Sequence, residues 1–153
     1  MEIYIKNLQR STRLDALKIK RNLARALRLL GLSQTELSVV FVNSERMRRL
    51  NARYRGIDRA TDVLSFPLSD NDPKRVGDKR GEGPFPLGDI ILCVPKALLQ
   101  AKEYGIPFSE ETLRLLVHGL LHLVGYDHEL NSYQKRKMEK KERELLDALK
   151  TVA

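Results

Sequence analysis

The feature of this sequence that most constrains its fold is a helix that is apolar on nearly every side. A helix at the surface of a protein needs only one apolar stripe, so a helix that is apolar all round has to be covered by other elements. Ser109 is a suitable N-cap for it, and Gly125 can end it in the left-handed conformation. We therefore expect a central, buried helix between these two residues. Its apolar side chains are Leu113, Leu115, Leu116, Val117, Leu120, Leu121, Leu123 and Val124.

Four short segments elsewhere in the chain have the pattern of β-strands. Polar and apolar residues alternate in the first, and β-branched, aromatic or other apolar residues are frequent in the others, which is typical of strands. Pro67 and Pro95 directly follow two of these segments and would end both strands. The expected strands cover residues 2–8, 37–42, 61–66 and 89–94.

Helical periodicity predicts four more helices around the central one. Leucines recur at helical spacing before Gly31, Ser44 is placed to cap a short basic helix, and Asn131 with Gln134 has the spacing of a capping box. The expected helices cover residues 14–30, 44–54, 95–105 and 131 onward. Because the strands are few and alternate irregularly with helices, we expect an α+β fold with a small mixed sheet rather than a regular βαβ fold.

A long polar segment, residues 69–87, separates the third and fourth expected strands. It contains Gly, Pro, Asp and Lys with almost no apolar content. Long loops inside compact domains are usually functional or disordered, so this segment is either a flap beside a cleft or a passive insert. No repeat or linker interrupts the chain, and we interpret residues 1–153 as a single domain.

The composition narrows the class of partner and the compartment. Lys and Arg outnumber Asp and Glu by 28 to 20, and the resulting charge of +8 suits either a polyanionic partner such as nucleic acid or merely a soluble basic surface. The single cysteine, Cys93, excludes an internal disulfide framework and lies in an apolar run, where we expect a buried side chain. The sequence shows neither a signal peptide nor an apolar stretch that could span a bilayer, so we expect a cytoplasmic protein that does not contact a membrane.

All three histidines of the chain lie within eleven residues, on the central helix or just after it. His118 and His122 are four residues apart, so both rings leave the same face of the helix. Gly125 and the following turn would bring His128 back towards this pair. A lone histidine on an apolar helix is more often a core residue, but three in the layout H-x-x-x-H-x-x-G-x-x-H match metzincin zinc sites. We predict that His118, His122 and His128 bind one Zn²⁺ and leave a fourth coordination position open, as at catalytic zinc sites.

Gly119 distinguishes this motif from that of the zinc proteases. In those enzymes a glutamate directly after the first histidine is the general base that activates the attacking water. Without a carboxylate at this position, the site lacks the general base that activates water for hydrolysis of a peptide bond. Zinc itself lowers the pKa of a bound water to roughly 7, which still allows hydrolysis of a substrate with a better leaving group. The sequence therefore predicts a hydrolytic site that is not proteolytic.

Four segments together resemble the YbeY family of metal-dependent endoribonucleases, which act on ribosomal RNA. They are LNARYRGID at residues 50–58, TDVLSFP at 61–67, LGDI at 87–90 and HGLLHLVGYDH at 118–128, and they span the central two thirds of the chain. The resemblance implies that His118, His122 and His128 are zinc ligands and that Arg55 is a functional, catalytic residue. It also implies a zincin-like α+β domain with the metal on the central helix. The implied role is maturation and quality control of small-subunit ribosomal RNA, with that RNA and the small ribosomal subunit as partners.

A cluster of arginines begins just before the first of these segments and ends just after it. Arginine is suited to bidentate contact with phosphate, although the positions do not share one face of a helix, so some of them are expected to be solvated charges. We expect Arg55 to reach the metal cleft and stabilise charge on a phosphoryl group. The cluster comprises Arg46, Arg48, Arg49, Arg53, Arg55 and Arg59.

Four aromatic residues are candidates for stacking on unpaired bases, as binding of a single strand requires. Tyr54 and Tyr126 are two of them. Phe66 precedes a proline that ends a strand, so a core position is the better interpretation for its ring. Phe85 lies in the long polar segment and is the better stacking candidate.

Two further features allow a functional and a structural interpretation. Asp127 is adjacent to a predicted ligand, where it either orients a histidine or bonds to nearby backbone as a turn residue. The segment 135–144 alternates basic and acidic side chains at helical spacing, which favours a solvated helix face.

Three functions are consistent with these features. The first is a zinc-dependent endoribonuclease that cuts single-stranded ribosomal RNA. The second is a ribosome-assembly factor that binds RNA or ribosomal proteins and whose metal site mainly stabilises the fold. The third is a peptidase with the zincin layout, and Gly119 argues against it.

Overall fold

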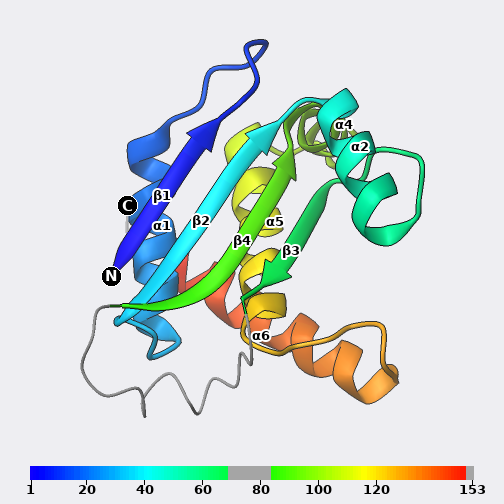
Figure 1. Cartoon of the computed structure of the whole chain (residues 1–153). Helices are drawn as coiled ribbons and strands as arrows, with labels where there is room; N and C mark the ends of the chain where they lie inside the picture. Colours follow the sequence, from blue (N-terminus) through cyan, green and yellow to red (C-terminus); the bar gives the residue numbers. More distant parts are fainter. Residues whose placement is uncertain (69–83, 151–153) are drawn as a thin grey trace.

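The framework of the protein is a four-stranded mixed sheet formed by β1 (Glu2–Asn7), β2 (Thr35–Val42), β3 (Val63–Pro67) and β4 (Phe85–Cys93). The computed structural model describes residues 1–68 and 84–150. The strands lie in the order β1-β2-β4-β3 (Figure 1). β2 pairs in parallel with β1 and with β4, whereas β3 runs antiparallel to β4 at one edge. The expected α+β fold with a small mixed sheet is thus confirmed.

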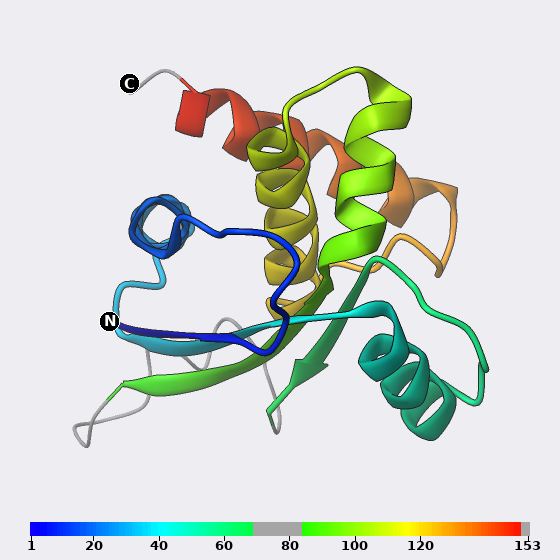
Figure 2. The same ribbon diagram turned by 90° about the horizontal axis from the view of Figure 1, so that it is seen from above.

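Helices cover both faces of this sheet. Figure 2 shows α1 (Ala16–Leu29), α4 (Val94–Tyr104), α5 (Phe108–Leu123) and α6 (Ser132–Lys150) on one side and α2 (Ser44–Arg55) on the other. The larger buried cluster fills the space between the sheet, α1, α5 and α6. A smaller cluster lies beneath α2 and includes Val42, Met47, Leu64 and Cys93. Cys93 is fully buried, as the sequence predicted.

The central helix of the fold is α5, which contacts α1, α4, α6, β3 and β4. Nine of its sixteen residues are buried, which agrees with its apolar composition. The backbone N–H groups of Glu110 and Glu111 donate to the carbonyl of Pro107, so Pro107 and not Ser109 is the N-cap and the helix begins at Phe108. Neither α5 nor any other helix that the structure describes is long and apolar enough to cross a membrane.

Several boundaries differ from the expected ones because side-chain caps and strand pairing extend or shift the elements. Asn43 caps α2 by accepting a bond from the Arg46 backbone N–H at 2.9 Å, so the predicted Ser44 cap was wrong by one residue. Asn131 caps α6 as expected, accepting from the Gln134 backbone N–H at 2.8 Å. Val94 belongs to α4, with Pro95 in its first turn, where a missing N–H costs nothing.

The strand β4 begins four residues earlier than the sequence predicted. Phe85, Pro86 and Leu87 were assigned to the long polar segment, yet Phe85 pairs with Thr35 and the strand continues through Gly88. Residues 69–83 of that segment, for which the sequence left a flap or a passive insert open, lie outside the described residues. At Gly88 the backbone φ is +143°, and an added Cβ would lie 2.3 Å from the Phe66 carbonyl oxygen. Only glycine fits there, since any side chain would collide with β3.

Candidate metal centre and its cleft

Three histidine rings converge on one side of α5. His118 and His122 are one turn apart on the helix, and the chain after Gly125 brings His128 back to them. His122 Nε2 lies 3.2 Å from His118 Nε2 and 2.9 Å from His128 Nδ1. The ring centroids are 4.7–5.0 Å apart. The structure therefore brings together the three side chains that the sequence assigned to a metal.

The return of the chain after α5 depends on backbone bonds at the helix end. Gly125 adopts a φ of +102°, and its N–H donates to the carbonyl of His122 at 3.1 Å. The Tyr126 N–H donates to the carbonyl of Leu121 at 3.0 Å. Asp127 accepts a bond from the Glu129 backbone N–H at 2.9 Å, which matches its interpretation as a turn residue.

The nitrogen positions fit a single metal ion. Two nitrogens bound to one tetrahedral ion at the usual zinc–nitrogen length lie roughly 3.3–3.4 Å apart. The two measured spacings, 3.2 and 2.9 Å, are close to this value. One nitrogen from each ring thus lies close enough for the three histidines to hold one ion. Imidazole is a ligand for several divalent transition metals, zinc among them.

The surroundings of His122 favour the form of the ring that binds metals. Burial lowers the pKa of His122 below its ordinary value, and the neighbouring imidazoles of His118 and His128 lower it further. A lowered pKa keeps the ring neutral at physiological pH, with a lone pair available.

Glu142 contacts the metal centre from α6, and the sequence analysis missed it. Its Oε1 lies against His118 Nδ1, on the opposite side of the ring from the converging Nε2. The predicted solvated face of residues 135–144 is therefore interrupted by one carboxylate that points inward. A signal was present in the sequence, because Glu142 is four residues after Met138 and three before Leu145, both of which are buried.

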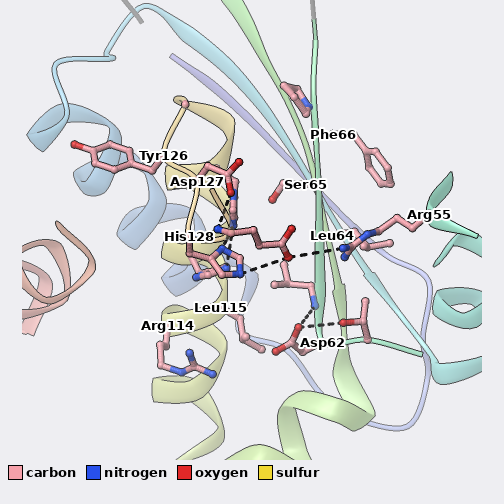
Figure 3. Close-up of a pocket in the computed structure, with 17 residues that line it drawn as sticks. Arg55, Asp62, Leu64, Ser65, Phe66, Arg114, Leu115, Tyr126, Asp127 and His128 are labelled. Carbon is pink, nitrogen blue, oxygen red and sulfur yellow. Dashed lines mark hydrogen bonds and ion pairs between the residues drawn. The ribbon is translucent and has the colours of Figure 1, made fainter. Parts of the chain in front are cut away.

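The histidines lie in a cleft of about 820 Å³. One wall is the edge strand β3 with the residues before it, and the opposite wall is α5 with the turn that follows. Figure 3 shows Arg55 beside β3 and Arg114 below His128, towards the other end of the cleft. The polar side chains that line the cleft are Arg55, Thr61, Asp62, Ser65, Arg114, Asp127 and Glu129, together with the three histidines.

Arg55 reaches the cleft, as the sequence predicted, and a carboxylate places it next to the histidines. The guanidinium lies 3.9 Å from Glu129 Oε1, and the same oxygen lies 3.7 Å from His128 Nε2 (Figure 3). Glu129 is 67% exposed, so this bridge is weak and leaves the guanidinium accessible to a ligand.

Three other arginines of the cluster around α2 contact neighbouring side chains. Arg48 binds both Glu45 and Asp58, at 2.9 and 2.8 Å, and Arg49 lies 3.8 Å from Glu45. Arg53 lies over the ring of Tyr54. Of this cluster, Arg55 is the arginine that lines the cleft.

Arg114, which the sequence analysis did not single out, is one turn before His118 on α5. Its guanidinium makes two bonds of 2.7 Å to the fully buried carboxylate of Glu111. Gln100 Nε2 donates to Glu111 at 2.8 Å and lies 3.3 Å from Asp62 Oδ2. This network holds Arg114 at the cleft and leaves part of its guanidinium facing the solvent.

Gly119 lies where α5 approaches the sheet most closely. Ser65 Oγ donates to the Gly119 carbonyl at 3.0 Å, and a Cβ at this position would lie 3.0 Å from Ile90 Cγ2 and 3.1 Å from Ser65 Oγ. A glutamate like that of the zinc proteases would have to displace Ile90 or Ser65. The absence of the protease base therefore also has a packing reason.

The four candidate stacking residues lie in different environments, and Phe66 packs against the smaller buried cluster, in agreement with the core position expected for it. Phe85 is buried, so it was the wrong choice as a stacking residue. Phe66 lines the cleft and packs edge-on against the exposed ring of Tyr54, with centroids 5.2 Å apart. Tyr126 also lines the cleft.

Comparison with protein families shows what the chain is similar to. A family model described as "Endoribonuclease YbeY" matches residues 4–150. A relative named endoribonuclease YbeY from Caldanaerobacter subterraneus subsp. tengcongensis is 41% identical over 151 residues, which cover 94% of each chain. A second, from Thermodesulfovibrio yellowstonii, is 44% identical over 114 residues and covers 74% of this chain and 67% of the relative.

A solved structure has the same fold. The solution structure of TM1509 from Thermotoga maritima superposes with a TM-score of 0.66 at 28% sequence identity. The match covers 96% of the present chain and 88% of that protein.

Proposed function

The chain belongs to the endoribonuclease YbeY family and is therefore a hydrolytic nuclease, and from this premise we propose that it is a zinc-dependent enzyme that cuts single-stranded ribosomal RNA. Its proposed role is ribosomal RNA processing and ribosome quality control in the cytoplasm, with the small ribosomal subunit as partner. We further propose a stoichiometry of one zinc ion per chain.

The observation that carries the metal assignment is the convergence of three histidine nitrogens in the cleft. Three imidazoles without a cysteine are the donor set of catalytic zinc sites, in which the fourth position stays open. When bound, such an ion would polarise a phosphate oxygen and lower the pKa of an attacking water. His118, His122 and His128 would hold it.

The side chains around the histidines support a phosphodiester as the substrate. Arg55 on one side and Arg114 towards the other end of the cleft can each donate hydrogen bonds to phosphate oxygens, because both guanidinium groups are partly exposed. A positive group fixed near the reacting phosphate stabilises the charge that develops in the transition state. At Gly119 even a Cβ would lie 3.0 Å from Ile90 Cγ2 and 3.1 Å from Ser65 Oγ, so the glutamate of a zinc protease would require these neighbours to shift.

The shape of the cleft supports a preference for single strands. It lies between the β3 edge and the turn after α5, so a substrate has to pass between two walls to reach the histidines. An unpaired strand can bend its backbone into such a cleft and stack its bases on Phe66 or Tyr126, whereas a duplex keeps its bases paired.

The test is cleavage of matched single-stranded and duplex RNA by purified protein, with zinc added and with zinc removed by a chelator. We expect faster cleavage of the single strand, loss of activity with the chelator and recovery on return of zinc. The variant His118→Ala, purified identically, controls for contaminating nuclease. Equal cleavage by wild type and variant would assign the activity to a contaminant. If neither cleaves a ribosomal RNA precursor, even with ribosomal subunits present, the role of an assembly factor with a structural metal is favoured instead.

A further inference from the structure

The buried stripe of α6 contains one carboxylate. Met138, Leu145 and Leu149 are the buried residues of this helix and belong to the larger buried cluster, and α6 contacts both α5 and α1 (Figure 2). Glu142 falls on the same stripe, four residues after Met138 and three before Leu145, and its side chain is only 16% exposed. A carboxylate at such a position costs free energy unless a partner compensates for its lost hydration.

The partner of Glu142 is a predicted metal ligand. Its Oε1 contacts His118 Nδ1, while His118 Nε2 faces the Nε2 atom of His122. An ionised carboxylate can only accept a hydrogen bond, so this contact favours the tautomer of His118 that carries its hydrogen on Nδ1. The lone pair is then on Nε2, which is the atom directed at the other two rings.

We propose that Glu142 is a positioning residue that fixes the tautomer and the orientation of His118, and that it thereby couples the docking of α6 to metal affinity. The inference rests on the metal site of the proposed function. Metal-ligating histidines commonly donate their second ring N–H to a carboxylate, and loss of that partner typically costs 10–100-fold in metal affinity. Glu129 approaches His128 in a similar way, but at 3.7 Å and from the solvent, so its effect is weaker.

A purely structural role for Glu142 makes a different prediction. If the carboxylate served only to hold α6 against α5, replacing it by leucine would affect the stability of the protein and its metal affinity together. If it positions His118, the leucine in Glu142→Leu completes the apolar stripe and keeps the metal-free protein as stable as wild type or more so, since apolar replacements of buried charged pairs are often neutral or stabilising. Metal affinity would fall all the same.

The experiment compares wild type with Glu142→Leu, Glu142→Gln and the control Glu144→Gln, all as full-length chains. Glu144 is on the same helix, is 53% exposed and lies near Lys141, so it matches the charge change without contacting the site. Zinc affinity is measured by competition with a chromogenic chelator, and thermal unfolding is recorded with EDTA present. We expect a 10–100-fold weaker zinc affinity in Glu142→Leu at an unchanged or higher melting temperature, and less than about a tenfold loss in Glu142→Gln, whose amide oxygen can still accept the bond. Glu144→Gln should bind zinc like wild type.

A second measurement reports the tautomer directly. Long-range ¹H–¹⁵N NMR spectra of the zinc-loaded protein should show the hydrogen of His118 on Nδ1, and this signal should exchange faster with water in Glu142→Leu. Wild-type zinc affinity in Glu142→Leu would overturn the inference while leaving the metal site intact. A hydrogen on Nε2 of His118 in zinc-loaded wild type would overturn the inference together with the assignment of that atom as a metal ligand. Failure of wild type itself to bind zinc would overturn the proposed metal site, and the inference with it.

Discussion

His122 lies between the other two predicted ligands, since its Nε2 is the atom within 3.2 Å of a nitrogen of each neighbour. Removal of this ring leaves two histidines, which are too few to hold an ion firmly. We expect His122→Ala to lose nearly all bound zinc, as measured by elemental analysis of protein purified from zinc-containing medium. Asp127→Asn is the matched control, because asparagine can keep the turn that Asp127 makes and should retain about one zinc per chain. A full equivalent of zinc in His122→Ala would contradict the site.

Arg55 permits a test of transition-state stabilisation. If its guanidinium contacts the reacting phosphate more strongly in the transition state than in the bound substrate, the variant loses rate more than affinity. We expect Arg55→Ala to reduce kcat by about 100-fold or more while RNA affinity falls less than about tenfold. Single-turnover kinetics and equilibrium binding separate the two. The control is Arg49→Ala, since Arg49 is on the same helix but does not line the cleft. Equal losses of rate and affinity would make Arg55 a simple binding residue.

At the scale of residues, the sequence predicted the site residues that lie together in one motif and missed those whose partners are distant in the chain. The three histidines were found because one helix turn and one glycine place them together within a single motif. Glu142 was missed because its partner His118 is 24 residues earlier in the chain, and only the packing of α6 on α5 determines which acidic side chain faces inward. Arg114 was missed for a similar reason. Its guanidinium binds the buried Glu111, and Glu111 is in turn bound by Gln100 of α4.

At the scale of elements, the close pairing of β3 with β4 supports one wall of the cleft. Gly88 makes this approach possible, since an added Cβ would lie 2.3 Å from the Phe66 carbonyl oxygen. We expect Gly88→Ala to lower the free energy of unfolding by about 2–4 kcal/mol, from the backbone strain at positive φ together with the collision. Urea denaturation measures this change. Zinc-supported cleavage should fall as well, because β3 has to move away from its position opposite the histidines.

The variant Gly31→Ala separates the two contributions to the loss of stability in Gly88→Ala, which are the backbone strain and the collision. Gly31 also has a positive φ, of +73°, but no atom lies within 4 Å of an added Cβ. Its substitution should therefore show the backbone strain alone, about 1–2 kcal/mol. If Gly88→Ala lowers the free energy of unfolding no more than Gly31→Ala does, β3 moves aside for the added methyl group without loss of stability.

The existence of the elements was predictable, whereas their ends and their pairing were not. Amphipathic and apolar patterns located every described helix and strand, because burial of side chains dictates them. The ends depend on individual hydrogen bonds. At the start of α2, for example, Asn43 and Ser44 are both suitable N-cap residues, and Asn43 makes the capping bond. The start of β4 was hidden because Pro86 and Gly88 are typical of loops, and only pairing with β2 reveals them as part of a strand. The order of the strands depends on pairing between segments that are far apart in the sequence, which local pattern does not show.

At the scale of the whole molecule, the net charge of +8 does not say which of the 28 Lys and Arg side chains are available to bind a polyanion. Several cationic side chains are already paired with carboxylates, including Arg48, Arg114 and Lys150. The cleft itself combines Arg55 from α2 with Arg114 from α5, which are far apart in the sequence. The charge balance predicted a class of partner, and the folded structure shows that these two arginines line the same cleft.

The salt dependence of RNA binding tests whether these cleft arginines meet phosphates. Each phosphate neutralised by a cationic side chain releases counterions, so the logarithm of affinity for a single strand should fall linearly with the logarithm of salt concentration, with a slope of about −0.7 per contact. We expect Arg55→Ala to make this slope shallower by about 0.7, and Arg49→Ala to leave it unchanged because Arg49 lies outside the cleft. Fluorescence anisotropy of a labelled RNA measures the affinity, with His118→Ala present in every variant to prevent cleavage. An identical slope with and without Arg55 would show that its guanidinium does not neutralise a phosphate of the bound strand. A slope near zero in all variants would mean that the basic surface serves solubility, and that recognition of the strand depends on stacking.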